Sequence, residues 1–531
     1  MTIAILQALL AAAGCYGLWR LWRALAGRGR ASQVITAGFV LRALGSQLLF
    51  WISWLRLPIA RSLQLGDGLW FFAIDGQWYL TYARDLLRRG PLAIVFVSGS
   101  YASRIFTQWL TVFTAAFGVV ASTGILFNSF FYLATCGLIL LIARDDERPR
   151  DFALAAIAFG PATILWSLQP LKDTYFVFLI VAMVAIWREW QKLWRGEGVR
   201  RPLPIAICAA TMWYLVYAIS GTRWYVGAFL VAISFFFLGV VANRPRPRLA
   251  GSVVAVLLFV VLGQAFVAGG DFDIPLPLRT ALDVRTIFRP RAHAERAKVL
   301  LTTVRRGFEM TPGNTMIVPG RALQTVAPVP TEPQPKPKAE PAPPSAEKVE
   351  ASPPPPPPAK KPESAAALSP PAKNPEVAPP PPRPFRIRRA HHRRVRAAAP
   401  SETVMSLVSK IAAGAAAMFV PRAIAQTVGL VRIGGGRGFW LFADLDTVVF
   451  DLVIFVALAY CARAIVRRER RVTPLFLLVL LLFAGLTAPM VYVVANFGTL
   501  FRLREMLYVF AALLPLTLGP RTPAPAPDGS R

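Results

Sequence analysis

Long apolar runs recur along most of the chain, and they restrict its fold more than any other feature of the sequence. Several of them approach the roughly 20 residues that an α-helix needs to span a bilayer. The runs are continuous rather than alternating, which disfavours a transmembrane β-barrel. The chain has 531 residues, is 55% hydrophobic and has a mean hydropathy of +0.49, which is more apolar than a soluble core of this size requires. We therefore predict an all-α polytopic membrane protein.

Counting the apolar runs predicts about eleven or twelve transmembrane helices. The count is ambiguous at one place, because the chain must cross an odd number of times between residues 103 and 144. Either Pro91–Tyr101 contains a half-helix or one of the runs 104–121 and 125–143 does not cross. A small-residue segment at 403–420 is expected to lie in the interface or to re-enter the membrane. The expected spans are 3–25, 34–55, 104–121, 125–143, 152–168, 174–187, 203–219, 224–242, 249–268, 439–461, 474–494 and 505–519.

The formal net charge of +31 suggests a nucleic-acid partner at first, but the arginines cluster at the ends of apolar runs. That placement is typical of topology set by the positive-inside rule, so we expect no nucleic acid. The rule puts the N-terminus and the loops 56–103, 169–173 and 496–505 outside the cytoplasm. The four cysteines are isolated and only three histidines occur, which disfavours a zinc site, a disulfide framework and catalysis by histidine.

The composition divides the chain into four segments. An N-terminal bundle, 1–268, with an outer loop at 56–103, is followed by a polar extracytoplasmic segment, 269–327. Residues 328–384 hold 23 of the 46 prolines, a composition that cannot bury a core and favours extended polyproline II. A disordered extracytoplasmic linker is therefore expected at 328–400. It ends in the basic run Arg386–Arg396, either a ligand for anionic lipid or an acidic polymer, or a solvated charge run. The C-terminal transmembrane segment is 401–531.

Three groups of polar residues are predicted to share the outer face. Asp75 is a lone acid in an aromatic stretch, and a charged group held at a membrane is usually functional. Lys172 and Asp173 follow an apolar run that prolines interrupt, as at the end of a discontinuous helix. Arg502 and Arg504 stand where a helix re-enters the membrane, in a form suited to phosphate. Each group has an alternative interpretation. Asp75 could be an exposed loop acid, and Asp173 could cap a helix while Lys172 snorkels to the interface. Arg502 and Arg504 could be a topological anchor.

The motif Asp75-Gly76-x-x-Tyr79-x-x-x-Ala83 resembles the first-loop acid motif of GT-C-type integral membrane glycosyltransferases. The run from Pro161 to Lys172-Asp173 is similar to their second acidic region. A common family form has Asp-Glu where this chain has Asp75-Gly76. The Gly-Thr-x-x-Arg-x-Arg run at 498–504 also resembles bacterial polysaccharide polymerases. The resemblance implies sugar transfer from a polyprenyl-phosphate donor on the outer face, often with a divalent cation such as Mg²⁺ or Mn²⁺.

Together these features predict a glycosyltransferase of the bacterial cytoplasmic membrane, which passes a sugar to an envelope glycan, lipid or protein. Asp75 is expected to deprotonate the acceptor hydroxyl or hold the metal, with Asp173 as a second metal ligand or orienting acid. Lys172, Arg502 and Arg504 are expected to neutralise the donor phosphate. The alternatives are a transporter or flippase of lipid-linked glycans, and a scaffold whose proline-rich linker recruits cell-envelope proteins.

Overall fold

The computed structural model describes residues 2–27, 29–95, 103–143, 146–195, 202–223, 226–227, 230, 317–319, 322, 404–433, 440–493 and 497–520. This part of the chain is mostly helical (84%), so the predicted all-α class is confirmed for it. All of it except Val404 belongs to one compact unit, which joins residues 1–326 to residues 405–531. The predicted spans at 224–242 and 249–268 and the proline-rich linker lie almost entirely outside the described residues.

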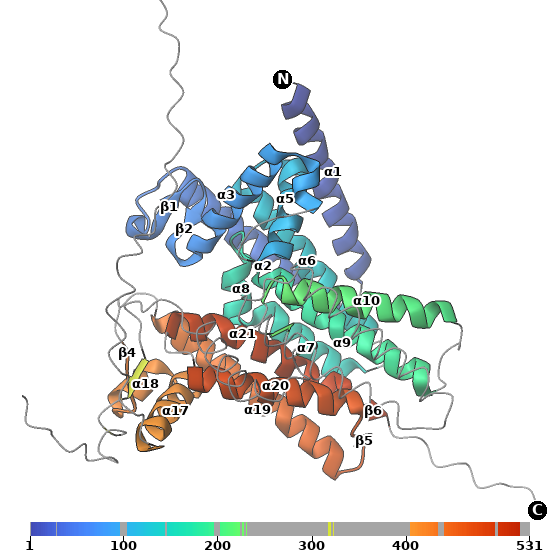
Figure 1. Ribbon diagram of the computed structural model, residues 1–531, viewed down its shortest axis with the longest axis vertical. Helices are drawn as coiled ribbons and strands as arrows, with labels where there is room; N and C mark the ends of the chain where they lie inside the picture. The colour runs from blue at the N-terminus through green and yellow to red at the C-terminus, as the bar shows by residue number, and fades with distance from the viewer. Residues whose placement is uncertain are drawn as a thin grey trace, which may run out of the picture. The chain divides into compact units, whose positions relative to one another are not determined.

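The helices and strands follow the apolar runs with a few additions (Figure 1). The helices are α1 (Thr2–Leu25), α2 (Arg30–Trp54), α3 (Ile74–Arg89), α4 (Pro91–Val95), α5 (Arg104–Phe117), α6 (Ala121–Ile142), α7 (Glu147–Phe159), α8 (Pro161–Ser167), α9 (Asp173–Arg195), α10 (Pro202–Ser220), α17 (Val404–Phe419), α18 (Arg422–Thr427), α19 (Trp440–Val466), α20 (Pro474–Val493) and α21 (Phe497–Leu513). Short 3₁₀ turns are η1 (Arg61–Leu63), η2 (Phe71–Ala73) and η5 (Leu514–Thr517). The strands pair two by two: β1 (Gln64–Gly66) with β2 (Leu69–Trp70), β3 (Ile317–Pro319) with β4 (Val431–Ile433), and β5 (Arg470–Arg471) with β6 (Gly519–Pro520).

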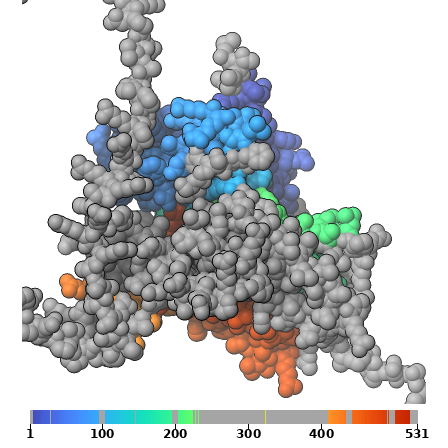
Figure 2. Space-filling model, viewed as in Figure 1, coloured from blue at the N-terminus to red at the C-terminus, as the bar shows by residue number. Residues whose placement is uncertain are grey.

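Three helices in the described part are long and apolar enough to cross a membrane: Arg30–Trp54, Ala121–Ile142 and Leu441–Val466. The last of these keeps large apolar side chains on its outside, with Leu441, Leu452 and Phe455 at least half exposed. Side chains of this helix, orange in Figure 2, reach the surface. An uncovered apolar stripe of this kind is expected on a helix that faces lipid.

Helix α5 covers one of the two runs at which the count of spans is ambiguous. It has 14 residues and ends at Phe117, because the next residue, Gly118, has a φ of +93° that does not fit a helix. At 1.5 Å per residue the helix is roughly 21 Å long, shorter than the roughly 30 Å hydrocarbon core of a bilayer. The run at 104–121 is therefore too short to cross by itself.

The run expected at 152–168 is a broken helix rather than a single span. Helix α7 ends at Phe159, and α8 begins at Pro161. Two buried charges from other helices cap the break. Arg42 of α2 donates to the carbonyl oxygens of Ile157 (2.7 Å) and Ala158 (2.6 Å), and Asp446 of α19 accepts from the backbone N–H of Ala162 (2.9 Å). A cation at a helix C-terminus and an anion at a helix N-terminus both match the helix dipole, so the break is stabilised from both sides.

The turn after α8 packs where two glycines leave room for Pro170. A Cβ atom on Gly76 of α3 would lie 3.1 Å from Pro170 Cγ. One on Gly124 of α6 would lie 2.8 Å from Pro170 Cα and overlap its Cβ. The side chain of Gln169, in the same turn, also donates to the carbonyl of Gly68 (3.3 Å) in the turn between β1 and β2. Glycine at position 76 thus lets α3 approach the α8–α9 turn closely.

We expect Gly124→Ala to destabilise the protein by about 1–3 kcal/mol, because the added methyl group overlaps the Pro170 backbone as well as its ring. Gly137→Ala on the same helix is the matched control, since its Cβ would meet only Leu25 Cδ2 at 3.5 Å. Thermal unfolding of both variants in detergent micelles measures the difference. Equal midpoints for the two variants would show that the α8–α9 turn has more room than the structure indicates.

Candidate functional site

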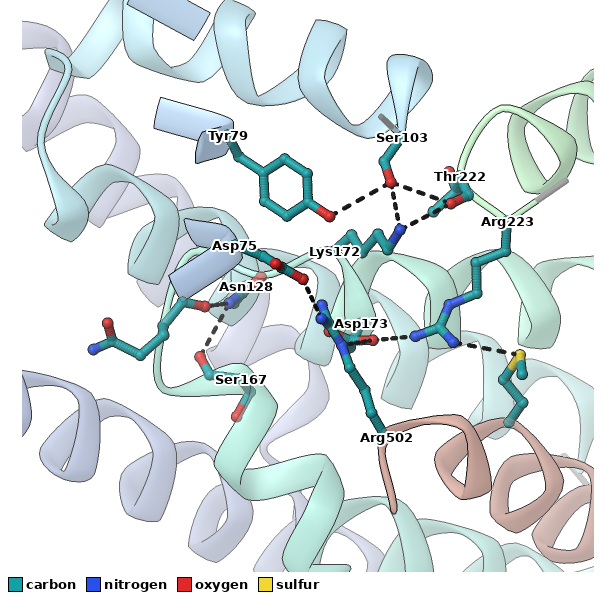
Figure 3. Close-up of polar contacts among 12 residues, drawn as sticks. Asp75, Tyr79, Ser103, Asn128, Ser167, Lys172, Asp173, Thr222, Arg223 and Arg502 are labelled. Atoms are coloured by element: carbon teal, nitrogen blue, oxygen red, sulfur yellow. Dashed lines mark hydrogen bonds and ion pairs between the residues drawn. The ribbon is translucent and has the colours of Figure 1, made fainter. Parts of the chain in front are cut away.

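The guanidinium group of Arg502 lies between two carboxylates that are far apart in the sequence. Its Nη2 is 2.7 Å from Asp173 Oδ2, its Nε donates to the same oxygen at 3.0 Å, and its Nη1 donates to Asp75 Oδ2. Asp75 and Arg502 are separated by 427 residues, and Asp173 and Arg502 by 329. Figure 3 shows Arg502 rising from α21 between the two acids. We call Asp75, Asp173, Arg502 and the neighbouring Arg223 the carboxylate–arginine cluster.

The two carboxylates of the cluster have different surroundings. The side chain of Asp173 is completely buried, and Arg223 donates to its Oδ1 while Arg502 donates to its Oδ2. The side chain of Asp75 is 40% exposed and has Arg502 as its ion-pair partner. Asp75 also lies in the first turn of α3, where the helix dipole favours a negative charge. Asp173 is thus arranged to fix two guanidiniums, whereas Asp75 is accessible to another molecule.

Lys172 forms a second set of contacts beside the cluster. Its Nζ donates to Ser103 Oγ, just before α5, and to the carbonyl oxygen of Thr222 (3.3 Å). The hydroxyl of Tyr79 lies 3.5 Å from Ser103 Oγ, and burial raises the pKa of Tyr79 to about 12. Burial, with the nearby charges of Arg223 and Arg502, lowers the pKa of Lys172 to about 7. Its ammonium group is therefore close to losing its proton at neutral pH.

The C-terminal part of the predicted site differs from the expectation in two respects. The segment 497–505, expected as a loop, is helical, because α21 begins at Phe497. Arg502 and Arg504 therefore point about 200° apart around the helix. Arg504 donates to Thr447 Oγ1 (2.7 Å) and the carbonyl of Met418 (3.1 Å), and pairs with Asp446 (3.3 Å). The structure thus does not bring Arg504 to Arg502.

Four of the five predicted site residues come together: Asp75, Lys172, Asp173 and Arg502. A second carboxylate, that of Asp173, lies on the other side of Arg502 from Asp75. Sequence reasoning missed Arg223, Ser103, Thr222 and Tyr79. Arg223 had a usable signal, because it follows an apolar run on the side that the arginine pattern predicts to be outside, where arginine is depleted. Tyr79 also had a signal, as a position of the Asp75 motif, whereas Ser103 and Thr222 had none, because they reach the site through packing.

The residues of the site do not fit the divalent cation that the resemblance implies. Both oxygens of Asp173 accept hydrogen bonds from arginines, and Asp75 pairs with Arg502. In the part of the chain that the structure describes, no group of three or more His, Cys, Asp or Glu side chains is placed to hold a metal. A dication needs several free oxygen ligands, and here two guanidiniums already occupy them.

We expect the affinity for an anionic ligand to fall as the pH rises through about 7, because Lys172 then loses its charge. The loss of one interacting charge is expected to weaken binding about tenfold, or about 1.4 kcal/mol. A short polyprenyl phosphodiester is a suitable probe, since its single charge does not change in this range. Titrations within about one pH unit of pH 7 should show this fall in the wild type, whereas Lys172→Arg should keep its affinity over that range. An equal fall in both proteins would contradict the assignment to Lys172.

Comparison with known proteins does not assign a function to this site. No family model, curated protein or solved structure matches the chain. The resemblance to GT-C-type enzymes therefore rests on the short motifs around Asp75 and Lys172-Asp173.

Proposed function

We propose that the protein is a membrane glycosyltransferase that moves a sugar from a polyprenyl-phosphate donor to an envelope glycan, lipid or protein. The observation that carries this proposal is the position of Arg502 between a half-exposed acid, Asp75, and a fully buried one, Asp173. A cation held beside an accessible carboxylate provides for both halves of a glycosyl transfer: neutralising the leaving phosphate and accepting a proton.

In the proposed reaction, Asp75 removes the proton from the acceptor hydroxyl. The acceptor oxygen forms a bond to the anomeric carbon as the bond from that carbon to the phosphate oxygen breaks. The phosphate leaves with the electron pair of the broken bond, and Arg502, Arg223 and Lys172 bind the polyprenyl phosphate that results. Asp173 acts as the orienting acid, because its burial and its two arginine partners leave it no access to the acceptor.

We propose a multi-pass protein of the bacterial cytoplasmic membrane in which the cluster opens to the outer face. The contact of Asp75, Lys172-Asp173 and Arg502 supports it, since all of them come from segments that the arginine pattern assigns to that face. Arg504, which pairs with Asp446, is assigned to holding α21 rather than to the phosphate. The proline-rich linker belongs to the same outer face in this arrangement.

The proposal is tested with the full-length protein in proteoliposomes that contain polyprenyl-phosphate-linked hexoses or pentoses and an envelope extract as acceptor. Release of free polyprenyl phosphate, measured by mass spectrometry, reports transfer whatever the sugar. Movement of intact donor between leaflets without release would instead indicate a flippase. Neither activity with any donor would overturn both assignments and favour a scaffold. Repeating the assay with EDTA tests the metal, and unchanged turnover is expected.

A further inference from the structure

The carboxyl group of Glu505 is buried in α21 beside the carboxylate–arginine cluster, and the proposed reaction does not use it. The residue is 3% exposed, and within the described part of the chain no hydrogen bond or ion pair reaches its oxygens. The two arginines on the same helix are directed elsewhere, Arg502 to the cluster and Arg504 to Asp446. Glu505 is therefore a buried acid that the surrounding side chains do not neutralise by direct contact.

Glu505 lines a cavity with room for about one water molecule. The hydroxyl groups around this cavity donate to backbone carbonyl oxygens and not to Glu505. Tyr508 donates to the carbonyl of Ala156 (2.8 Å), and Thr163 donates to that of Gly160 (2.8 Å). Asp446, also at the cavity wall, has its oxygens turned to the N–H of Ala162 and to Arg504. A carboxylate at position 505 would thus be desolvated without a donor among these groups.

The charges farther away do not remove this cost. Arg42 is held by the end of α7, the cluster arginines by Asp173, and Arg504 by Asp446. Asp173 and Asp446 add negative potential at Glu505, which opposes a further negative charge. A buried carboxylate without hydrogen bonds costs several kcal/mol, whereas the protonated acid is neutral. The charged and titratable groups that face Glu505 are Arg42 of α2, Asp173 of α9, Arg223 after α10, Asp446 of α19, and Arg502, Arg504 and Tyr508 of α21.

We propose that Glu505 is a proton-binding site whose proton favours the binding of an anion at Arg502 and Arg223. The neutral acid adds no negative charge beside the two arginines, whereas the carboxylate places there a negative charge that competes with the anion. Because such coupling is reciprocal, the bound anion also favours the proton. The coupling rests on the proposed phosphate site; the proton site itself does not.

The proton is detected directly by infrared spectroscopy of the purified full-length protein in micelles. A protonated carboxyl group has a carbonyl stretching band that shifts when the protein is exchanged into D₂O. We expect Glu505→Gln to lack one such band that the wild type shows at neutral pH, and Glu505→Asp to shift it. Equal unfolding midpoints of wild type and Glu505→Gln confirm that the fold is kept. Identical carboxyl bands in all three proteins would overturn the proposal.

The coupling is measured with the short polyprenyl phosphodiester in the Lys172→Arg background, where Lys172 no longer titrates. The affinity of Lys172→Arg for the probe is expected to fall at least about threefold, or by about 0.7 kcal/mol, at more alkaline pH. The fall occurs where Glu505 gives up its proton. The double variant with Glu505→Gln is expected to keep its affinity. The same decline in both would overturn the coupling. If the probe binds to none of the proteins, the proposed phosphate site fails, and the infrared result still decides whether Glu505 carries a proton.

Discussion

Asp75→Asn is expected to reduce sugar transfer by about 10²–10⁴-fold, the usual contribution of a general base. The amide has nearly the same shape as the carboxylate but does not accept the proton of the acceptor hydroxyl. Arg502 keeps its hydrogen bonds to Asp173, so the guanidinium stays in place. The measurement is the rate of polyprenyl-phosphate release at saturating donor and acceptor, compared with the wild type.

The matched control for this substitution is Asp85→Asn. Asp85 lies on the same helix, its side chain is 42% exposed, and it forms a surface ion pair with Arg89 one turn away (2.8 Å). Such pairs contribute about 0.3–0.5 kcal/mol, so turnover and unfolding should both stay close to the wild type. If Asp75→Asn were as active as Asp85→Asn, the assignment of Asp75 as the base would be wrong.

Asp173→Asn is expected to have the largest effect on stability, a loss of about 3–5 kcal/mol. The substitution removes the charge that compensates two arginines, and one of them, Arg223, has a side chain that is only 3% exposed. Buried cations without a counter-ion are costly in a low-dielectric surrounding, which raises the energy of the folded state. Unfolding of the purified protein in micelles measures the loss.

A second variant separates this charge effect from a loss of shape. Combining Asp173→Asn with Arg223→Gln removes one of the uncompensated cations, so the double variant should recover part of the stability. A double variant that is less stable than Asp173→Asn would indicate that Arg223 contributes chiefly by packing, for example against the ring of Phe176, which lies 4.9 Å from its guanidinium carbon. Asp75→Asn is the comparison for an exposed carboxylate, and its stability loss should be small.

The sequence was sufficient to place most helices of the described chain. Apolar runs mark spans because lipid leaves helices few alternatives, and the observed α2, α6 and α19 follow the runs at 34–55, 125–143 and 439–461. The errors arose where a run was ambiguous in length or had a break. The run at 152–168 was read as one span, although Pro161 begins a new helix there. The helix at 497–513 starts earlier than its apolar residues suggest, because its first two turns carry the polar groups that pack inside.

The juxtaposition of Asp75, Lys172-Asp173 and Arg502 was predicted only as a shared face. That prediction used the arginine pattern, which acts along the membrane normal and carries no information about lateral position. The contacts between these residues depend on lateral packing, such as the close approach of Gly76 and Gly124 to Pro170. Arg504 is a further case in which the sequence pattern did not determine the contact. Two arginines two positions apart can face the same ligand in a loop, but on a helix they point in different directions.

By itself, the sequence determined that the chain is helical and has helices long and apolar enough to cross a membrane, because hydropathy is a local property of each segment. Only the tertiary structure decided that Arg502 joins Asp75 to Asp173, that Arg223 completes the cluster, and that Glu505 is left buried beside it. These facts depend on which faces of helices hundreds of residues apart come into contact. Burial and pairing, which set the charge of each acid and base, are properties of that contact and not of any one segment.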